Sequence, residues 1–256
     1  MEPGTNPHKF SLLFSETCGT AIFISCIFYT AVYQTNPLAI AIGVGGGLFI
    51  AIIIFGKETG GHFNPAVTIG YYVFIAENKL EKTVNFILML LGQVVGGFIA
   101  GLLLFYTANQ NEPVLKPDEE NLLGSFLDEI FFTFLFLSVI YCVKSQNLSM
   151  TKDGTLGVMT VCMTLALCVL YGGQISGACY NPAVGIAMNF WATFAHKDQR
   201  YIKYVSYYIM APVIGGLLAG FLNRFFLNIP FPLEAEKYEV EKGEGDIEEN
   251  KGMINA

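Results

Sequence analysis

The chain alternates long apolar segments with short polar ones, and this pattern predicts membrane-spanning helices. A helix needs about 20 predominantly apolar residues to cross a hydrocarbon core. Segments of that length recur from residue 10 onward and contain few charges. We place spans at residues 10–34, 38–55, 84–107, 122–143, 155–171 and 202–226. Six crossings leave both ends of the chain on one side of the membrane.

Two shorter apolar runs follow a repeated tetrapeptide, Asn-Pro-Ala-Val, at 64–67 and 181–184. The runs, 65–75 and 182–191, are each roughly 15 Å long at 1.5 Å per residue, half of a bilayer core. Proline is favourable at the first helical position, and asparagine is a preferred N-cap. Non-helical backbone is tolerated at this depth only where it lines a watery cavity or is buried in protein. We therefore expect two re-entrant half-helices that meet end to end and line a pore.

The two Asn-Pro-Ala segments occupy equivalent places in an internal repeat. Asn64 lies 48 residues after Glu16, and Asn181 lies 52 residues after Glu129, in similar surroundings. Each unit contains three spans, so the second unit must enter the membrane from the opposite side. Such units are related by a pseudo-two-fold axis in the membrane plane. The predicted fold class is therefore an all-α membrane protein with six transmembrane helices, two re-entrant half-helices and inverted three-helix repeats.

The predicted organisation has five parts. They are a cytosolic N-terminus (1–9), a first repeat with the half-helix after Asn64 (10–110), a connecting loop (111–121), a second repeat with the half-helix after Asn181 (122–228) and an acidic disordered cytosolic tail (229–256).

The distribution of lysine and arginine predicts that both termini are cytoplasmic. Basic residues near span ends are enriched on the cytoplasmic side. With the N-terminus inside, the inner set is Lys9, Lys57, Lys79, Lys82, Lys144, Lys152, Arg224 and Lys237, and the outer set is Lys116, Lys197, Arg200 and Lys203. Which cellular membrane holds the chain is not specified by the sequence.

Composition supports a lipid-embedded chain. Hydrophobic residues make up 53% and charged residues 14%, whereas a soluble domain has roughly 25% charged residues. The net charge of −7 is concentrated in the loops and the tail. No catalytic nucleophile, metal-ligand cluster or phosphate-binding loop stands out. We expect no enzyme activity, no cofactor or metal, and no nucleic-acid partner.

Residues 10 to about 226 resemble the aquaporin family, also called major intrinsic proteins. The resemblance is carried by Glu16-x-x-Gly19-Thr20, Gly61-His62-Phe63-Asn64-Pro65-Ala66-Val67-Thr68, Gln93-x-x-Gly96, Glu129, Gly177-x3-Asn181-Pro182-Ala183 and Pro212-x-x-Gly215. It implies a right-handed bundle of six tilted helices with two half-helices. It also implies a homotetramer in the lipid membrane.

The positive N-termini of the half-helices and the amides of Asn64 and Asn181 are predicted to meet a passing solute. The pore motifs are then Asn64, Pro65, Ala66, Asn181, Pro182 and Ala183. Glu16 and Glu129 are interpreted as acceptors for the loops before the half-helices. An intramembrane carboxylate is also a candidate proton carrier. His62 is expected to brace its loop, with a pH-sensing role as the alternative.

The resemblance also implies an extracellular constriction made by four positions. In this chain they fall on Val44, Val169, Ala178 and Val184, and Val184 replaces an arginine that is usual in the family. This apolar ring of small residues predicts weaker discrimination against urea, ammonia, glycerol or hydrogen peroxide. Gly185, at a position that is commonly Asp in glycerol-conducting relatives, and the short loops favour a water-type channel instead.

The leading hypothesis is a passive channel for water and small neutral solutes. A broad glycerol, urea and ammonia facilitator with poor water specificity is the nearest alternative. A proton-coupled or ion transporter would need charges along the pathway, and few occur within the spans. A scaffold or adhesion protein with little transport is the alternative from a different class.

Overall fold

The computed structural model describes residues 9–75, 79–145 and 148–227 of the 256-residue chain. The helices in these ranges are α1 (Lys9–Tyr33), α2 (Pro37–Thr59), α3 (Pro65–Phe74), α4 (Lys79–Thr107), α5 (Leu122–Lys144), α6 (Gly154–Gly172), α7 (Pro182–His196), the 3₁₀ helix η1 (Tyr201–Tyr204), α8 (Val205–Leu222) and the π-helix η2 (Asn223–Leu227). The predicted acidic tail (229–256) and residues 1–8 lie outside the described part of the chain.

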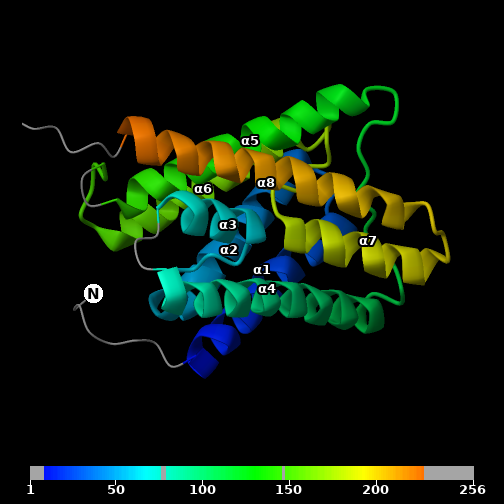
Figure 1. Ribbon diagram of the computed structural model, residues 1–256. Coiled ribbons are helices and arrows are strands. Elements are labelled where there is room, and N and C mark those ends of the chain that lie inside the picture. The colour runs from blue at the N-terminus through cyan, green and yellow to red at the C-terminus, as the bar shows by residue number, and fades with distance from the viewer. Residues whose placement is uncertain (1–8, 76–78, 146–147, 228–256) are drawn as a thin grey trace, which may run out of the picture.

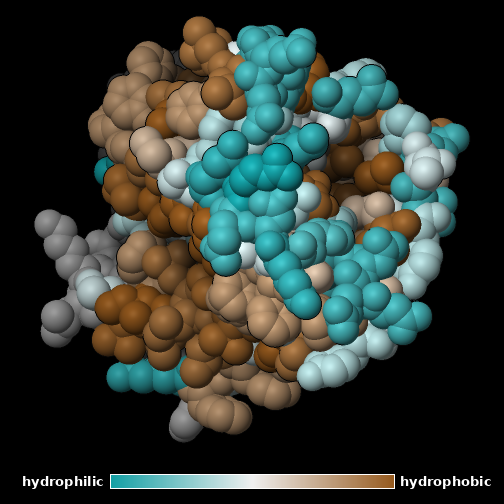
Figure 2. All heavy atoms as spheres, turned by 90° about the vertical axis from the view of Figure 1, so that its right-hand side faces the viewer, coloured by the Kyte–Doolittle hydropathy of each residue, from teal (hydrophilic) through white to brown (hydrophobic). Residues whose placement is uncertain are grey.

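Within the described residues, helical segments of membrane-spanning length occur at six places, as the apolar pattern predicts. They are Lys9–Tyr33, Pro37–Thr59, Thr83–Thr107, Leu122–Lys144, Gly154–Gly172 and Tyr201–Leu227. Their outward faces expose large apolar side chains, including Ile42, Ile53, Phe131 and Met163. Figure 2 looks onto the end of the bundle that carries the loop 108–121, where hydrophilic side chains gather, while the flanks are largely hydrophobic. The chain is an integral, multi-pass membrane protein.

The two halves of the chain pack in matching ways. Helix α1 contacts α2 and α4, and in the second half α5 contacts α6 and α8. The short helix α3 also packs against α8, and α7 packs against α4, so each half supports the short helix of the other. In Figure 1, α3 and α7 reach toward each other from opposite ends of the bundle. This arrangement confirms the predicted inverted-repeat fold.

Glycines allow the short helices to lie close to their supports. An added Cβ at Gly216 of α8 would lie 2.6 Å from the carbonyl oxygen of Ala66 in α3. An added Cβ at Gly97 of α4 would lie 3.2 Å from the carbonyl oxygen of Ala183 in α7. Small residues permit such close backbone approach between membrane helices. The related spacings Gly97/Gly101 and Gly216/Gly220 therefore hold the half-helices in place.

Helix α7 is longer than the sequence pattern predicts. It continues past Trp191 to His196, and Lys197 ends it in a left-handed conformation with φ of +55°. The added turns are stabilised by tertiary contacts, because Phe105 of α4 packs against both Trp191 and Phe194. These contacts come from α4 and leave no signal in the apolar run after Asn181.

Candidate functional site

Asn64 and Asn181 are joined crosswise at the centre of the bundle. The amide nitrogen of Asn64 donates to the carbonyl oxygen of Tyr180 at 2.9 Å, and that of Asn181 donates to the carbonyl oxygen of Phe63 at 2.9 Å. Each asparagine also caps its own helix, because its Oδ1 accepts from the backbone N–H of Ala66 or Ala183. The N-termini of α3 and α7 therefore meet at this point.

The residue before each asparagine has a left-handed backbone conformation. Phe63 has a φ of +46° and Tyr180 a φ of +47°. Such conformations cost about 1–3 kcal/mol for a residue with a side chain, and persist only where the surroundings enforce them. Both carbonyl groups then face the opposite asparagine, as the crosswise hydrogen bonds require. The strain is therefore part of the geometry that brings the two asparagines together.

Glu16 fixes the loop before α3. Its carboxylate oxygens accept hydrogen bonds from the backbone N–H groups of His62 at 3.3 Å and Phe63 at 3.0 Å. The amide nitrogen of Gln93 donates to Glu16 at 2.7 Å and lies 2.8 Å from the hydroxyl of Thr68. His62 is buried and its Nδ1 lies 3.1 Å from the same hydroxyl. These contacts are those of a carboxylate and an imidazole that brace a loop.

Glu129 has the equivalent position in the second half. It accepts from the backbone N–H groups of Cys179 at 2.8 Å and Tyr180 at 2.9 Å. The hydroxyl of Ser176 lies 2.7 Å from both Glu129 and Asp128, and it donates a hydrogen bond to one of these two carboxyl groups. In the sequence, Asp128 is a charged residue near the start of the span predicted at 122–143. The structure includes it in the buried network that supports the second loop.

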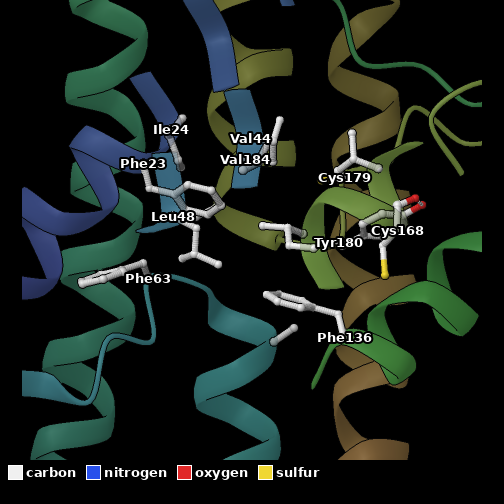
Figure 3. Packing of buried hydrophobic residues seen from close by; sticks show 14 of the residues in the cluster. Phe23, Ile24, Val44, Leu48, Phe63, Phe136, Cys168, Cys179, Tyr180 and Val184 are labelled. Atoms are coloured by element: carbon white, nitrogen blue, oxygen red, sulfur yellow. Dashed lines mark hydrogen bonds between the residues drawn. The ribbon is translucent and has the colours of Figure 1, made fainter. Parts of the chain in front are cut away.

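The four residues of the predicted ring lie together beside the asparagine pair. Val44, Val169, Ala178 and Val184 all line a central cavity of about 30 Å³, which Asn64 and Asn181 also line. A cavity of this size holds about two water molecules at most. Figure 3 shows Val44 and Val184 close together, with Phe23 from α1 and Phe136 from α5 on either side of the same region. The sequence pattern did not single out either phenylalanine.

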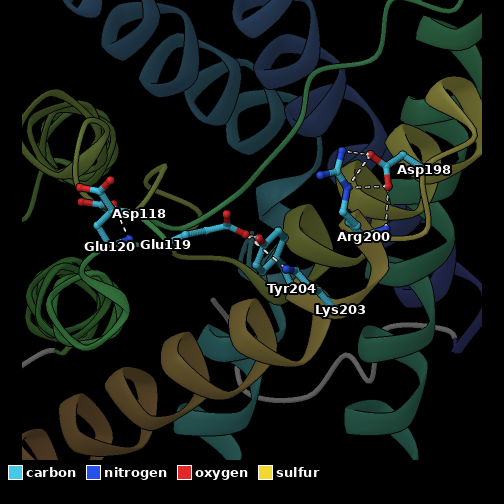
Figure 4. Close-up of polar contacts among 7 residues, drawn as sticks. All are labelled: Asp118, Glu119, Glu120, Asp198, Arg200, Lys203 and Tyr204. Atoms are coloured by element: carbon cyan, nitrogen blue, oxygen red, sulfur yellow. Dashed lines mark hydrogen bonds and ion pairs between the residues drawn. The ribbon is translucent and has the colours of Figure 1, made fainter.

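A wide vestibule of about 640 Å³ leads to this cavity, and we name it the outer vestibule because it lies on the side predicted to be extracellular. The loop 108–121 forms part of its wall, where Leu115 donates its backbone N–H to the side chain of Asn189 in α7. Figure 4 shows a second attachment of this loop, in which Glu119 contacts Lys203 and Tyr204 of η1. The Lys203–Glu119 ion pair is exposed, so it adds little stability. The loop is held mainly by its buried contacts.

An inner vestibule of about 580 Å³ lies on the other side of the asparagine pair. His62, Gly60 and Lys144 line it, and the ammonium group of Lys144 donates to the carbonyl oxygen of Gly60 at 2.6 Å. Together the two vestibules and the central cavity follow the bundle from one end to the other. Within residues 9–75, 79–145 and 148–227, no group of three or more His, Cys, Asp or Glu side chains could hold a metal ion.

Most of the predicted site residues converge on this pathway. Phe23 and Phe136 also line the central cavity but were not among the predicted site residues. They hold matching places in the repeat, since each follows its glutamate, Glu16 or Glu129, by seven residues. Both are almost fully buried. A phenylalanine in an apolar span is ordinarily a packing residue, so the sequence alone gave no reason to select these two. Only the tertiary arrangement places them beside the asparagine pair.

The fold and the paired asparagines define a membrane channel with inverted repeats. The family model described as Major intrinsic protein matches residues 6–223. The chain therefore belongs to the major intrinsic protein family, as its resemblance to aquaporins indicates.

Known proteins are similar over most of the chain. Aquaporin TIP1-1 from Arabidopsis thaliana is 31% identical over 244 residues, covering 89% of this chain and 91% of the relative. Glycerol uptake facilitator protein-like 6 from Lactiplantibacillus plantarum is 28% identical, with coverage of 82% and 95%. The solved structure of the aquaglyceroporin from Plasmodium falciparum has a TM-score of 0.72 at 19% identity and covers 86% of this chain and 98% of that one. This structural likeness supports the fold.

Proposed function

We propose that the chain is a passive channel that conducts water and other small neutral solutes down their gradients. The observation that carries the proposal is the crosswise pair of hydrogen bonds between the Asn64 and Asn181 loops, at the narrow cavity between two vestibules. Relatives in the family include proteins named as aquaporins and as a glycerol uptake facilitator. Both kinds of solute are uncharged and carry oxygen atoms that accept hydrogen bonds.

The asparagine pair explains how neutral molecules pass and cations do not. Each amide nitrogen carries two N–H donors, and one of them makes the crosswise hydrogen bond. The other donor is assigned to the oxygen of the passing molecule. The N-termini of α3 and α7 both direct their positive dipole ends at this point, which repels cations. An ion would also lose its hydration in the apolar cavity, and burial of an unpaired charge is very costly.

Glu16 and Glu129 serve in this proposal as loop supports, and His62 braces the first loop. This role is favoured over a proton relay because each carboxylate accepts hydrogen bonds from two backbone N–H groups of its loop. A carboxylate engaged in this way maintains the left-handed conformation of Phe63 or Tyr180. The two glutamates thus keep the asparagines in register.

The ring of Val44, Val169, Ala178 and Val184 is proposed as the outer selective region. These residues offer no side-chain hydrogen-bond donor and no positive charge, so their contribution to solute choice is steric. They line both the outer vestibule and the central cavity. An opening of this kind admits solutes wider than water, such as urea and glycerol, to the asparagine pair.

The proposed arrangement in the membrane has both termini in the cytoplasm and four chains assembled as a homotetramer. The excess of lysine and arginine at one end of the bundle supports the orientation. Exposed apolar side chains on the outer helix faces, such as Ile42 and Met163, support contact with lipid or with neighbouring copies. Crosslinking in native membranes would test the tetramer, and a protease-protection assay would test the orientation.

Reconstituted vesicles and stopped-flow light scattering test the function directly. We expect osmotic shrinkage in a sucrose gradient to be faster than in protein-free vesicles. In urea or glycerol gradients, the re-swelling that follows the initial shrinkage reports entry of those solutes. Shrinkage no faster than in empty vesicles contradicts the channel and favours the scaffold alternative. In Val184→Arg the added side chain should reduce urea and glycerol entry. Unchanged entry would show that Val184 does not line the selective region.

A further inference from the structure

The central cavity shares many more lining residues with the outer vestibule than with the inner vestibule. The outer vestibule and the central cavity share six lining residues: Ile27, Val44, Val169, Ala178, Cys179 and Val184. All four members of the apolar ring belong to this shared wall. The outer vestibule therefore continues broadly into the central cavity, and the ring borders both spaces.

The inner side is different. Among the described residues, Phe136 is the single side chain that lines both the inner vestibule and the central cavity. It is 3% exposed, and its ring projects from α5 into the pathway region (Figure 3). Phe136 therefore lies at the boundary between the central cavity and the inner vestibule.

Phe136 also has a counterpart in the first half of the chain. Phe23 of α1 occupies the equivalent place, seven residues after Glu16, and lines the central cavity but not the inner vestibule. The two phenylalanines narrow the region around Asn64 and Asn181 to a cavity of about 30 Å³, beside vestibules of about 580 and 640 Å³. The smallest described space along the pathway thus has phenylalanine side chains in its wall. On its outer side, the four small residues of the apolar ring form the boundary with the outer vestibule.

We propose that Phe136 is the residue that determines the largest solute this channel conducts, and that the size limit lies at the inner side of the asparagine pair. The inference rests on the proposed channel function. The small residues of the outer ring admit solutes wider than water, and the ring of Phe136 then excludes those that do not fit. Urea, a flat molecule, passes Phe136 more readily than glycerol, and larger sugar alcohols are excluded.

The test compares Phe136→Ala with two matched variants in the same vesicle assay. Phe131→Ala makes the same chemical change on the lipid-facing side of α5, where Phe131 is 57% exposed. Val169→Ala also shortens an apolar side chain of the pathway, but at the outer ring. For Phe136→Ala we expect the ratio of glycerol to water permeability to rise about tenfold, the lower end of what one methylene group is worth in a shaped apolar pocket. Phe131→Ala should change this ratio less than twofold. Val169→Ala widens the proposed selective ring itself, so it should raise the ratio, but less than Phe136→Ala does.

Recovery of folded protein is checked by gel filtration, and permeability is expressed per reconstituted channel. If Phe136→Ala does not fold, Phe136→Leu takes its place with the same criteria, and Phe136→Trp should lower glycerol entry below that of the wild type. An unchanged ratio in the Phe136 variants, or a larger increase in Val169→Ala, overturns the inference. Because water permeability is measured in the same vesicles, failure of the channel proposal appears separately, as the absence of protein-dependent flux in the wild type.

Discussion

The carboxylate of Glu129 accepts a hydrogen bond of 2.9 Å from the backbone N–H of Tyr180, a residue 51 positions further along the chain. The neighbouring N–H of Cys179 donates to the other carboxylate oxygen. Through these two contacts a buried side chain of α5 sets the backbone of the loop that carries Asn181. In the proposed channel, the geometry of the pore centre therefore depends on an acceptor that need not contact a solute.

Glu129→Leu should destabilise the protein and abolish water conduction. It leaves the two backbone N–H groups without an acceptor, and each buried unsatisfied donor costs about 1–3 kcal/mol. Glu129→Gln keeps one acceptor oxygen and should be intermediate. Thermal unfolding in detergent and stopped-flow permeability measure the two effects. Glu120→Gln, a change at an exposed position, is the control. A fully conducting Glu129→Leu channel would show that the loop needs no acceptor from α5.

Asn64→Asp should introduce cation leakage. The aspartate cannot donate to the carbonyl oxygen of Tyr180, and it places a negative charge where the two helix N-termini otherwise repel cations. We expect sodium or potassium flux in ion-loaded vesicles for this variant and none for the wild type. Asn36→Asp makes the same change at the exposed N-cap of α2, outside the central cavity, and should leave ion exclusion intact. If both variants exclude sodium and potassium equally well, the electrostatic barrier proposed for the asparagine pair is contradicted.

Gly216→Ala and Gly46→Ala should have opposite effects on stability. The added methyl group at Gly216 would overlap the backbone of α3 at 2.6 Å, and overpacking of this kind costs about 1–3 kcal/mol. Gly46 has no heavy atom within 4 Å of the added Cβ, so alanine there should stabilise α2 by roughly 0.5–1 kcal/mol. The midpoint of thermal unfolding in detergent measures both. A Gly216→Ala variant as stable as the wild type would show that α3 can move away from α8 without cost.

Glu112 lies in the loop between α4 and α5, outside the spans, and we expect it to make the stability of the protein depend on pH. Its side chain is 2% exposed, and neither carboxylate oxygen has a hydrogen-bond partner within the described part of the chain. Burial raises the pKa of this carboxyl group to about 7. Because the folded state holds the proton more tightly than the unfolded chain, this group's contribution is most favourable in acid and falls as pH rises from the ordinary glutamate pKa of about 4.3 to about 7.

Glu112→Gln removes the charge and should therefore stabilise the protein at pH 8 by about 1–3 kcal/mol while changing little at pH 4.5. Thermal unfolding of both forms across this pH range provides the measurement. The exposed Glu120→Gln serves again as the reference, with no comparable difference between the two pH values expected. A constant difference between Glu112→Gln and the wild type at all pH values would contradict the assignment.

The fold could be predicted from the sequence because a bilayer restricts the possible structures. Apolar segments of spanning length, two half-length runs after Asn64 and Asn181, and matching glutamates in each half leave few arrangements that satisfy every backbone group in lipid. The small apolar residues expected at the ring, from Val44 to Val184, also lie together beside the asparagines. These features are written in local sequence: length, polarity, capping residues and repeat spacing.

Other features were decided only by the tertiary structure. The crosswise bonds from each asparagine to the other loop, the inclusion of Asp128 in the network around Ser176, and the position of Phe136 between two spaces all join residues far apart in the chain. In the sequence alone, the asparagines resemble ordinary helix caps, Asp128 resembles a charged residue near the end of a span, and Phe136 resembles a packing residue. The role of each side chain depends on which atoms of another helix stand opposite, and that follows from packing in three dimensions, which the order of residues specifies only through the complete fold.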